Sequence, residues 1–125
     1  MAVEAIGRLY AEKFALEIAC LRIGSFEERP RERRHLATWV SPRDLAGFVR
    51  AALTARGLGF AALYAVSHNT RRFRDLAAGR ALGYTPVDDA EAFAGDIEGS
   101  EAPLAGPQSG EYTAAEYTLR HLRPR

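Results

Sequence analysis

The chain has 125 residues, 47% of them hydrophobic and 26% charged, which is expected to give one domain with a hydrophobic core and argues against extensive disorder. Its formal net charge of +1 provides no broad field for a nucleic acid or a membrane surface, and no apolar run approaches the ~20 residues of a membrane helix. The single cysteine, Cys20, excludes an internal disulfide and a multi-cysteine metal site, and a reducing, cytoplasmic setting is expected.

An amphipathic helix is predicted over residues 2–14. Its apolar residues recur at three- and four-residue spacings, as one stripe of a helix requires. The members of this stripe are Val3, Ile6, Tyr10 and Phe14. The apolar run 16–24 then predicts a buried strand of a parallel sheet, which ends at Gly24. A charged loop is expected over residues 26–34.

A helix start is indicated after a short extended segment at residues 36–40. Ser41 can cap the helix, Pro42 suits the first helical position, and Asp44 stands where the acid of a capping box would. This helix is expected to end before Gly57.

The second buried strand is predicted over residues 60–66. The polar turn 67–70 follows it and is expected to face the same crevice as the end of the first strand. Thr70 is predicted to cap a helix that closes at Gly83, and a further short helix is expected over residues 88–94.

The alternation of helices and strands indicates an α/β architecture with parallel strands. Two strands are too few for a complete parallel sheet, which is normally covered on both faces and larger. The chain is therefore predicted to form an incomplete, doubly wound domain over residues 1–95. Residues 96–125 are rich in Gly, Pro and acids near their start, and are expected to form a partly flexible tail.

The most informative polar residues lie where the first strand ends, because ligands of open parallel sheets bind outside the carboxyl ends of the strands. Ser25 follows Gly24 at this point, and a glycine lets a ligand approach the backbone closely. An ordinary turn between strand and loop is the alternative interpretation.

Four arginines lie within the next segment, and a guanidinium suits a carboxylate or a phosphate because it can donate two parallel hydrogen bonds. They are Arg29, Arg31, Arg33 and Arg34. Interleaved glutamates reduce the local field, so most of these charges are expected to be solvated, while one of them can turn inward. The three histidines lack metal-ligand spacing, and His68 has no identifiable partner as an acid or base.

Four stretches of the sequence and one arginine resemble uronate dehydrogenases, which are extended short-chain dehydrogenases of the NAD-dependent epimerase/dehydratase superfamily. The resemblance covers about residues 2–95. It is carried by Leu-Arg-Ile-Gly-Ser at 21–25, by Arg34, by residues 36–44, by Tyr-Ala-Val-Ser-His-Asn-Thr at 64–70 and by Leu-Gly-Tyr-Thr-Pro at 82–86. It implies the C-terminal part of a Rossmann-like, doubly wound parallel sheet with a small substrate-binding portion.

The resemblance also implies roles for particular residues. Members of this family oxidise the C1 hydroxyl of a hexuronic acid to an aldarolactone and pass the hydride to NAD. Ser25 matches a residue that touches the sugar, and Arg34 matches the arginine that grips the substrate carboxylate. Gly24 and Ser25 would lie near the nicotinamide, and Tyr112 would be an aromatic lid. No catalytic residue and no metal ligand is implied.

The sequence departs from the family in what it lacks. It has no Gly-rich nucleotide-binding turn, and Tyr10 and Lys13 are one residue too close for the Tyr-x-x-x-Lys pair. The chain is therefore expected to be inactive alone and to need a missing N-terminal half, or to self-associate. A non-catalytic relic or interaction module, and half of another sugar epimerase or reductase, are the alternatives.

Overall fold

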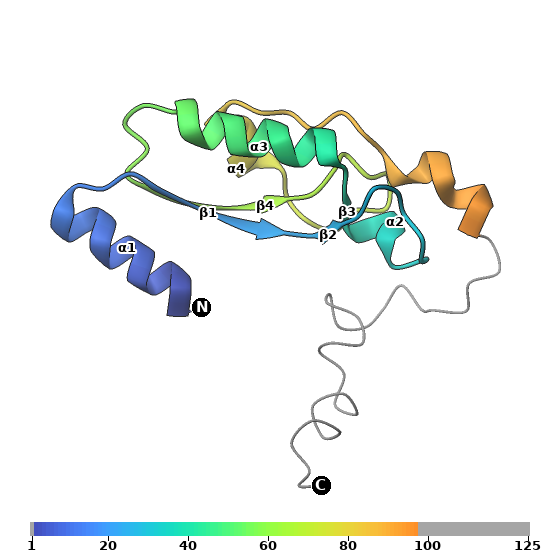
Figure 1. Ribbon diagram of the computed structural model, residues 1–125, viewed down its shortest axis with the longest axis horizontal. Helices are drawn as coiled ribbons and strands as arrows, with labels where there is room; N and C mark the ends of the chain where they lie inside the picture. Colours follow the sequence, from blue (N-terminus) through green and yellow to red (C-terminus); the bar gives the residue numbers. More distant parts are fainter. Residues whose placement is uncertain (1, 98–125) are drawn as a thin grey trace, which may run out of the picture.

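A computed structural model describes residues 2–97 and shows two helical layers around a small parallel sheet (Figure 1). The elements in chain order are α1 (Ala2–Phe14), β1 (Ile18–Ile23), β2 (Ser25–Phe26), α2 (His35–Thr38), β3 (Trp39–Val40), α3 (Pro42–Thr54), β4 (Phe60–Ala65), α4 (Ala77–Leu82) and the 3-10 helix η1 (Ala90–Ile97). No helix in this part of the chain is long and apolar enough to cross a membrane.

Strands β1 and β4 form a parallel pair, in register from Ile18 opposite Phe60 to Ile23 opposite Ala65. A second, shorter parallel pair joins β2 to β3, with Ser25 opposite Trp39. The expected α/β fold with parallel strands is confirmed. Within residues 2–97 neither pair is extended by a further strand.

The main core lies between the β1–β4 pair and the helices α3 and α4, which cover one face of it, while α1 lies on the other face (Figure 1). Phe48 of α3, Leu63 and Ala65 are buried together, and the ring of Tyr84 packs on Phe48 with centroids 5.0 Å apart. A Cβ atom at Gly79 would lie 2.7 Å from the Phe48 ring, so α4 needs a glycine there to approach the core.

A second, smaller core lies between α2 and η1. Leu36, Trp39 and Ala90 are buried, and Phe93 of η1 packs edge-on against the Trp39 indole with centroids 5.6 Å apart. This cluster joins the irregular segment after β1 to η1.

Several sequence-based boundaries were wrong. Residues 36–38 belong to the helical turn α2, whose backbone N–H groups of Leu36 and Ala37 donate to Arg33 and Arg34, and only Trp39 and Val40 are extended. Thr70 caps no helix: its hydroxyl donates to Asp89, and α4 begins at Ala77. The closing glycine was predicted correctly, since Gly83 adopts a φ of 119°.

The N-terminus of α3 is capped as predicted, since the Ser41 hydroxyl accepts from the Asp44 N–H at 3.0 Å. The second half of the expected capping box is absent. The Ser41 N–H donates instead to the Ser67 hydroxyl at 2.9 Å, and the Asp44 carboxylate serves other partners.

Candidate functional site

A cleft of about 1050 Å³ opens at the carboxyl end of β1. Its lining comes from β1, β2, α2 and β4, together with the start of α1 and the segment after β4. Three arginines reach it: Arg22, Arg34 and Arg74. The cleft is therefore placed where parallel α/β sheets bind ligands, and it is lined by cations suited to an anion.

Ser25, Arg34 and Thr38 meet at one end of this cleft. Nη1 of Arg34 lies 3.2 Å from the Ser25 hydroxyl oxygen, and that oxygen lies 2.8 Å from the Thr38 hydroxyl. The parallel pairing of β2 with β3 brings Ser25 to the end of α2, where Thr38 is located. Ser25 and Thr38, which are 13 positions apart in the sequence, are thereby held side by side.

The direction of these hydrogen bonds follows from their partners. The Thr38 hydroxyl donates to the backbone carbonyl of Arg34 at 3.1 Å, which uses its proton. Ser25 must therefore donate to Thr38, and it accepts from the Arg34 guanidinium. This chain of bonds fixes Arg34 by both its backbone and its side chain.

Among residues 2–97, Arg34 contacts the carboxylate of Glu32, and part of its side chain remains exposed to solvent. Its side chain is 21% exposed, and its Nη2 lies 3.2 Å from the half-exposed carboxylate of Glu32. A surface pair of this kind contributes little because water screens it. A guanidinium can donate two parallel hydrogen bonds to a carboxylate, and Arg34 lines the cleft.

His35 is buried beside this arginine. Its Nδ1 accepts the backbone N–H of Arg31 at 3.1 Å, so its Nε2 carries the proton in the neutral ring. Burial, followed by the positive charge of Arg34, lowers the pKa of His35 below its usual value. A neutral His35 adds no second positive charge behind Arg34.

The other end of the cleft is built around Tyr64 of β4. The Arg22 guanidinium lies 5.0 Å from the ring centroid and that of Arg74 lies 4.6 Å from it. Glu4 of α1 holds Arg22 through two hydrogen bonds of 2.8 and 2.6 Å, which lowers the pKa of the Glu4 carboxyl. Arg74 has no carboxylate partner among residues 2–97, and it touches Tyr64 and Phe73.

Close packing requires a glycine at position 24, which the sequence alone did not reveal. A Cβ atom there would collide with the backbone carbonyl oxygen of Thr38 and lie 2.8 Å from Val66. The missing side chain lets β1 pass close to α2. The position lines the cleft, and the space beside its Cα is filled by the chain itself.

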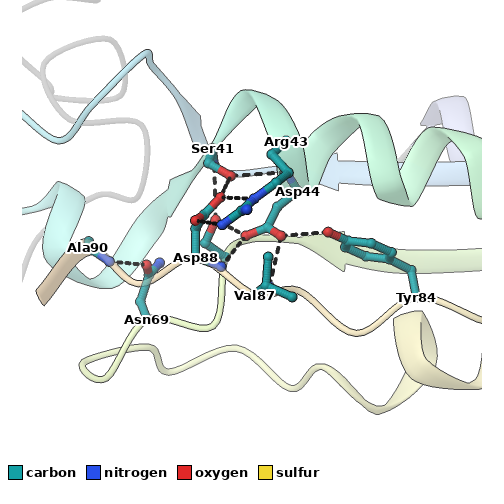
Figure 2. A network of polar contacts seen from close by, with 9 residues as sticks. Ser41, Arg43, Asp44, Asn69, Tyr84, Val87, Asp88 and Ala90 are labelled. Carbon is teal, nitrogen blue, oxygen red and sulfur yellow. Dashed lines mark hydrogen bonds and ion pairs between the residues drawn. The ribbon is translucent and has the colours of Figure 1, made fainter. Parts of the chain in front are cut away.

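A buried polar network holds the segment 84–90 against the N-terminus of α3 (Figure 2). The Asp44 carboxylate is fully buried and accepts four hydrogen bonds. The donors are the Tyr84 hydroxyl at 2.7 Å, the Val87 N–H at 2.9 Å, the Ser67 hydroxyl at 2.6 Å and the Asp88 N–H at 3.0 Å. A carboxylate with four donors is well satisfied, so this network is a structural anchor.

Asp88 and Asn69 extend this anchor. Asp88 accepts from Ser41 at 2.5 Å and pairs with Arg43, which lowers the pKa of the Asp88 carboxyl. The Asn69 amide donates to the Trp39 carbonyl at 2.8 Å and accepts from the Ala90 N–H at 3.0 Å. The network therefore ties α3, the end of β4 and η1 together.

The polar turn after β4 does not face the cleft as expected. Ser67 and Asn69 are fully buried in the anchor, while His68 is exposed. The two buried side chains satisfy backbone groups of the loops around α2 and α3. No three His, Cys, Asp or Glu side chains gather for a metal ion within the described part of the chain.

The structure brings Ser25 and Arg34 together, with Gly24 beside them, as the sequence led us to expect of a shared site. Tyr112 lies outside the described residues. Sequence reasoning did not single out Thr38 or Tyr64 as site residues. Thr38 reaches the site because β2 pairs with β3, and Tyr64 reaches it because β4 pairs with β1; neither pairing is visible in the sequence.

Comparisons with known proteins point to one group. The chain is 30% identical to a uronate dehydrogenase from Pseudomonas putida over 116 residues, which is 93% of this chain and 43% of that protein. It is similar to a solved structure described as a mutated uronate dehydrogenase, with a TM-score of 0.81, 33% identity and coverage of 94% of this chain and 46% of the other.

A second solved structure is an Agrobacterium tumefaciens uronate dehydrogenase mutant complexed with NAD. It matches 83% of this chain and 39% of its own length, with a TM-score of 0.74 and 35% identity. No protein-family profile matches the chain. The chain thus spans less than half the length of these relatives.

Proposed function

Because this chain is uronate dehydrogenase-like over most of its length, we propose that it supplies the sugar-acid side of an NAD-dependent oxidation of a hexuronic acid. The reaction would convert the C1 hydroxyl to an aldarolactone. In this proposal residues 1–95 are a C-terminal half of the dehydrogenase domain and residues 96–125 follow it as a tail. The chain is inactive alone and works in the cytoplasm.

The observation that carries the proposal is the pair formed by Arg34 and Ser25. A uronate has one carboxylate and several hydroxyls, so its recognition needs one two-pronged cation and neighbouring hydroxyl partners. Arg34 provides the cation at the edge of the cleft, and Ser25 provides a hydroxyl 3.2 Å from it. Tyr112, the proposed lid, is the remaining substrate contact.

The described residues do not fit a whole dinucleotide. The N-terminus of α3, where a pyrophosphate would be favoured in an α/β fold, is capped by Ser41 and faced by the carboxylates of Asp44 and Asp88. Two negative groups there would repel a phosphate. We therefore assign Gly24 and Ser25 only to the nicotinamide end of an NAD site, and derive no hydride step from this chain.

The proposal is tested by reconstitution. The purified chain is mixed with a polypeptide carrying the part of the Pseudomonas putida uronate dehydrogenase that this chain does not match. NADH formation from NAD and glucuronate is followed by absorbance. The controls are this chain alone, the added polypeptide alone, and the mixture with glucose in place of glucuronate. We expect NADH only from the mixture with glucuronate. No NADH at any mixing ratio, or equal rates with glucose, would count against the proposal.

A second candidate is a non-catalytic interaction module, and one observation favours it. Large apolar side chains of α1 lie in solvent, Val3 being 72% exposed. A protein that binds another chain through this face without turning over a sugar acid would show association and no NADH in the same experiment.

A further inference from the structure

The Ser25 hydroxyl lines the cleft, and its neighbours fix the direction of its proton. Its oxygen lies 2.8 Å from the Thr38 hydroxyl and 3.2 Å from Nη1 of Arg34. A serine hydroxyl has one proton and two lone pairs, and a guanidinium only donates, so Arg34 takes one lone pair. The direction of the bond to Thr38 then decides what Ser25 can offer a ligand.

The Arg34 backbone sets the direction of that bond. The Thr38 hydroxyl lies 3.1 Å from the Arg34 carbonyl oxygen, which can only accept, so the single proton of Thr38 is used there. The Ser25 proton therefore points to Thr38. If Thr38 donated to Ser25 instead, its bond to the carbonyl would be lost. That arrangement is therefore the less stable of the two.

Thr38 is held in this orientation by its surroundings. Its exposure is 7%, and its side chain branches at Cβ, which restricts rotation about the first side-chain torsion. Gly24 packs against its backbone carbonyl so closely that a Cβ atom would not fit between them. The proton of Thr38 is therefore placed on the Arg34 carbonyl before a ligand is present.

One lone pair of Ser25 remains for a ligand. Within residues 2–97 the Ser25 hydroxyl has no hydrogen-bond partner besides Arg34 and Thr38. A lone pair attracts a donor and repels another acceptor. The ligand group that touches Ser25 must therefore carry a proton, which a sugar hydroxyl has and an ionised carboxylate lacks.

We propose that Thr38 is a positioning residue that holds Ser25 as a hydrogen-bond acceptor, so that the cleft selects a sugar acid whose C4 hydroxyl donates to Ser25. This rests on the proposed function, in which Arg34 binds the carboxylate. In the pyranose form of a hexuronic acid, C4 carries the hydroxyl nearest to the carboxylate. Ser25 is the hydroxyl bonded to the Arg34 guanidinium, so a carboxylate on Arg34 brings the C4 hydroxyl toward Ser25.

The proton direction is measurable in the full chain without a ligand. The carbonyl carbon of Arg34 is followed by magnetic resonance in an isotope-labelled chain. Thr38→Val should shift this signal because the bond from the hydroxyl is lost, while the Ala37 N–H keeps the carbonyl bonded at 3.2 Å. Ser25→Ala removes a hydroxyl that does not donate to this carbonyl, and should leave the signal close to its parent position. Equal shifts in the two variants would overturn the proposal.

Ligand selectivity tests the consequence. Glucuronate is compared with the glucuronate analogue in which fluorine replaces the C4 hydroxyl, because fluorine is of similar size and cannot donate a hydrogen bond. Both are titrated by calorimetry into the full chain mixed with the unmatched portion of the Pseudomonas putida uronate dehydrogenase. The parent mixture should bind the analogue more weakly by about tenfold or more, because the Ser25 lone pair then faces fluorine.

Substitutions separate the proton direction from packing. Thr38→Val frees the Ser25 proton to turn to the ligand, so the difference in affinity between the two acids should narrow to about threefold or less. Thr38→Ser returns the hydroxyl and should restore the difference. Thr54→Val is the matched control, because the exposed Thr54 hydroxyl also donates to the carbonyl four residues earlier, at Arg50 in α3. It should keep the parent difference. Circular dichroism confirms that each variant is folded.

Three results in the titrations would overturn the role of Thr38. One is equal affinity of the parent mixture for both acids. Another is a difference that Thr38→Val leaves unchanged or that Thr54→Val narrows as much. The third is a failure of Thr38→Ser to restore the difference. If glucuronate is still preferred over glucose in these cases, the proposed function stands and only the role of Thr38 is rejected. A mixture that binds glucuronate no more tightly than glucose would reject both.

Discussion

The guanidinium of Arg34 donates to the hydroxyl of Ser25 over 3.2 Å, across the mouth of the cleft. Thr38 completes the contact by accepting the Ser25 proton and donating its own to the backbone of Arg34. The side chain proposed to hold a carboxylate is thus oriented before any ligand arrives, which lowers the entropic cost of binding.

Arg34→Leu is expected to weaken glucuronate binding by about 2 kcal/mol or more, because a charged hydrogen-bonded partner of the carboxylate is lost. Binding of glucose should change little. Calorimetry on the reconstituted mixture measures both sugars. Arg29→Leu is the matched control, since Arg29 is an exposed arginine of the same loop that does not line the cleft. An equal loss in both variants would contradict a specific role for Arg34.

Ser25→Ala is expected to lower the free energy of unfolding by about 1 kcal/mol, because Thr38 and Arg34 each lose a hydrogen-bond partner. Urea denaturation measures the change. Thr38→Val removes the link from the other side. Because the two residues are in contact, the double variant should cost less than the sum of the single ones. Additive losses would show that the hydroxyls act independently.

Asp44→Ala is expected to destabilise the fold by about 3–5 kcal/mol, because four buried or half-buried donors lose their acceptor together. Asp96→Asn, at an exposed position of η1, should be nearly neutral. Thermal and urea unfolding measure both variants. A loss below about 1 kcal/mol for Asp44→Ala would mean that the network is not the anchor of residues 84–90.

Tyr84 is expected to ionise late. Burial and the neighbouring Asp44 carboxylate raise its pKa from 10.0 to about 12, because a phenolate there would lose water and face a negative charge. Since the folded pKa is the higher one, the stability that it contributes is complete below pH 10 and is lost as the pH rises toward 12. Absorbance titration should show a late-titrating phenol that Tyr84→Phe removes. A titration curve left unchanged by the substitution would contradict this.

The buried His35 is expected to make the fold less stable in acid. Its folded pKa is lowered by burial and by Arg34, so the unfolded chain takes up a proton at higher pH than the folded chain does. The stability contributed by neutral His35 is present above about pH 6.5 and declines as the pH falls below it. His35→Asn, which retains an acceptor for the Arg31 N–H, should flatten this part of the pH profile. Equal slopes would exclude His35 as the cause.

The sequence predicted the elements with strong periodicity and clear caps. The helix at 2–14 and the strands ending near Gly24 and Val66 follow from apolar spacing, and the Ser41 cap follows from its hydroxyl and the proline after it. The position of Arg34 beside Ser25 could be predicted only from the family resemblance, because the eight intervening residues of charged loop fix no direction.

Other features could not be predicted from the sequence because they depend on tertiary contacts. Asp44 resembles a capping-box acid in the sequence, but in the fold its buried carboxylate accepts hydrogen bonds from four other donors. Thr70 looks like a cap, but Asp89 from a later segment binds its hydroxyl. The apolar residues of α1 look like a core face in the sequence, but in the structure they are exposed, while Gly7 lies against Phe60.

The most direct measurement is the magnetic resonance signal of the Arg34 guanidinium in an isotope-labelled chain, mixed with the unlabelled complementary portion of the Pseudomonas putida enzyme. Arg34→Leu assigns the signal. Adding glucuronate should shift it and slow the exchange of its protons, whereas glucose should leave it unchanged, because only glucuronate offers a carboxylate. If glucuronate does not shift the Arg34 signal, or if both sugars shift it equally, the assignment of this cleft to a sugar acid is contradicted.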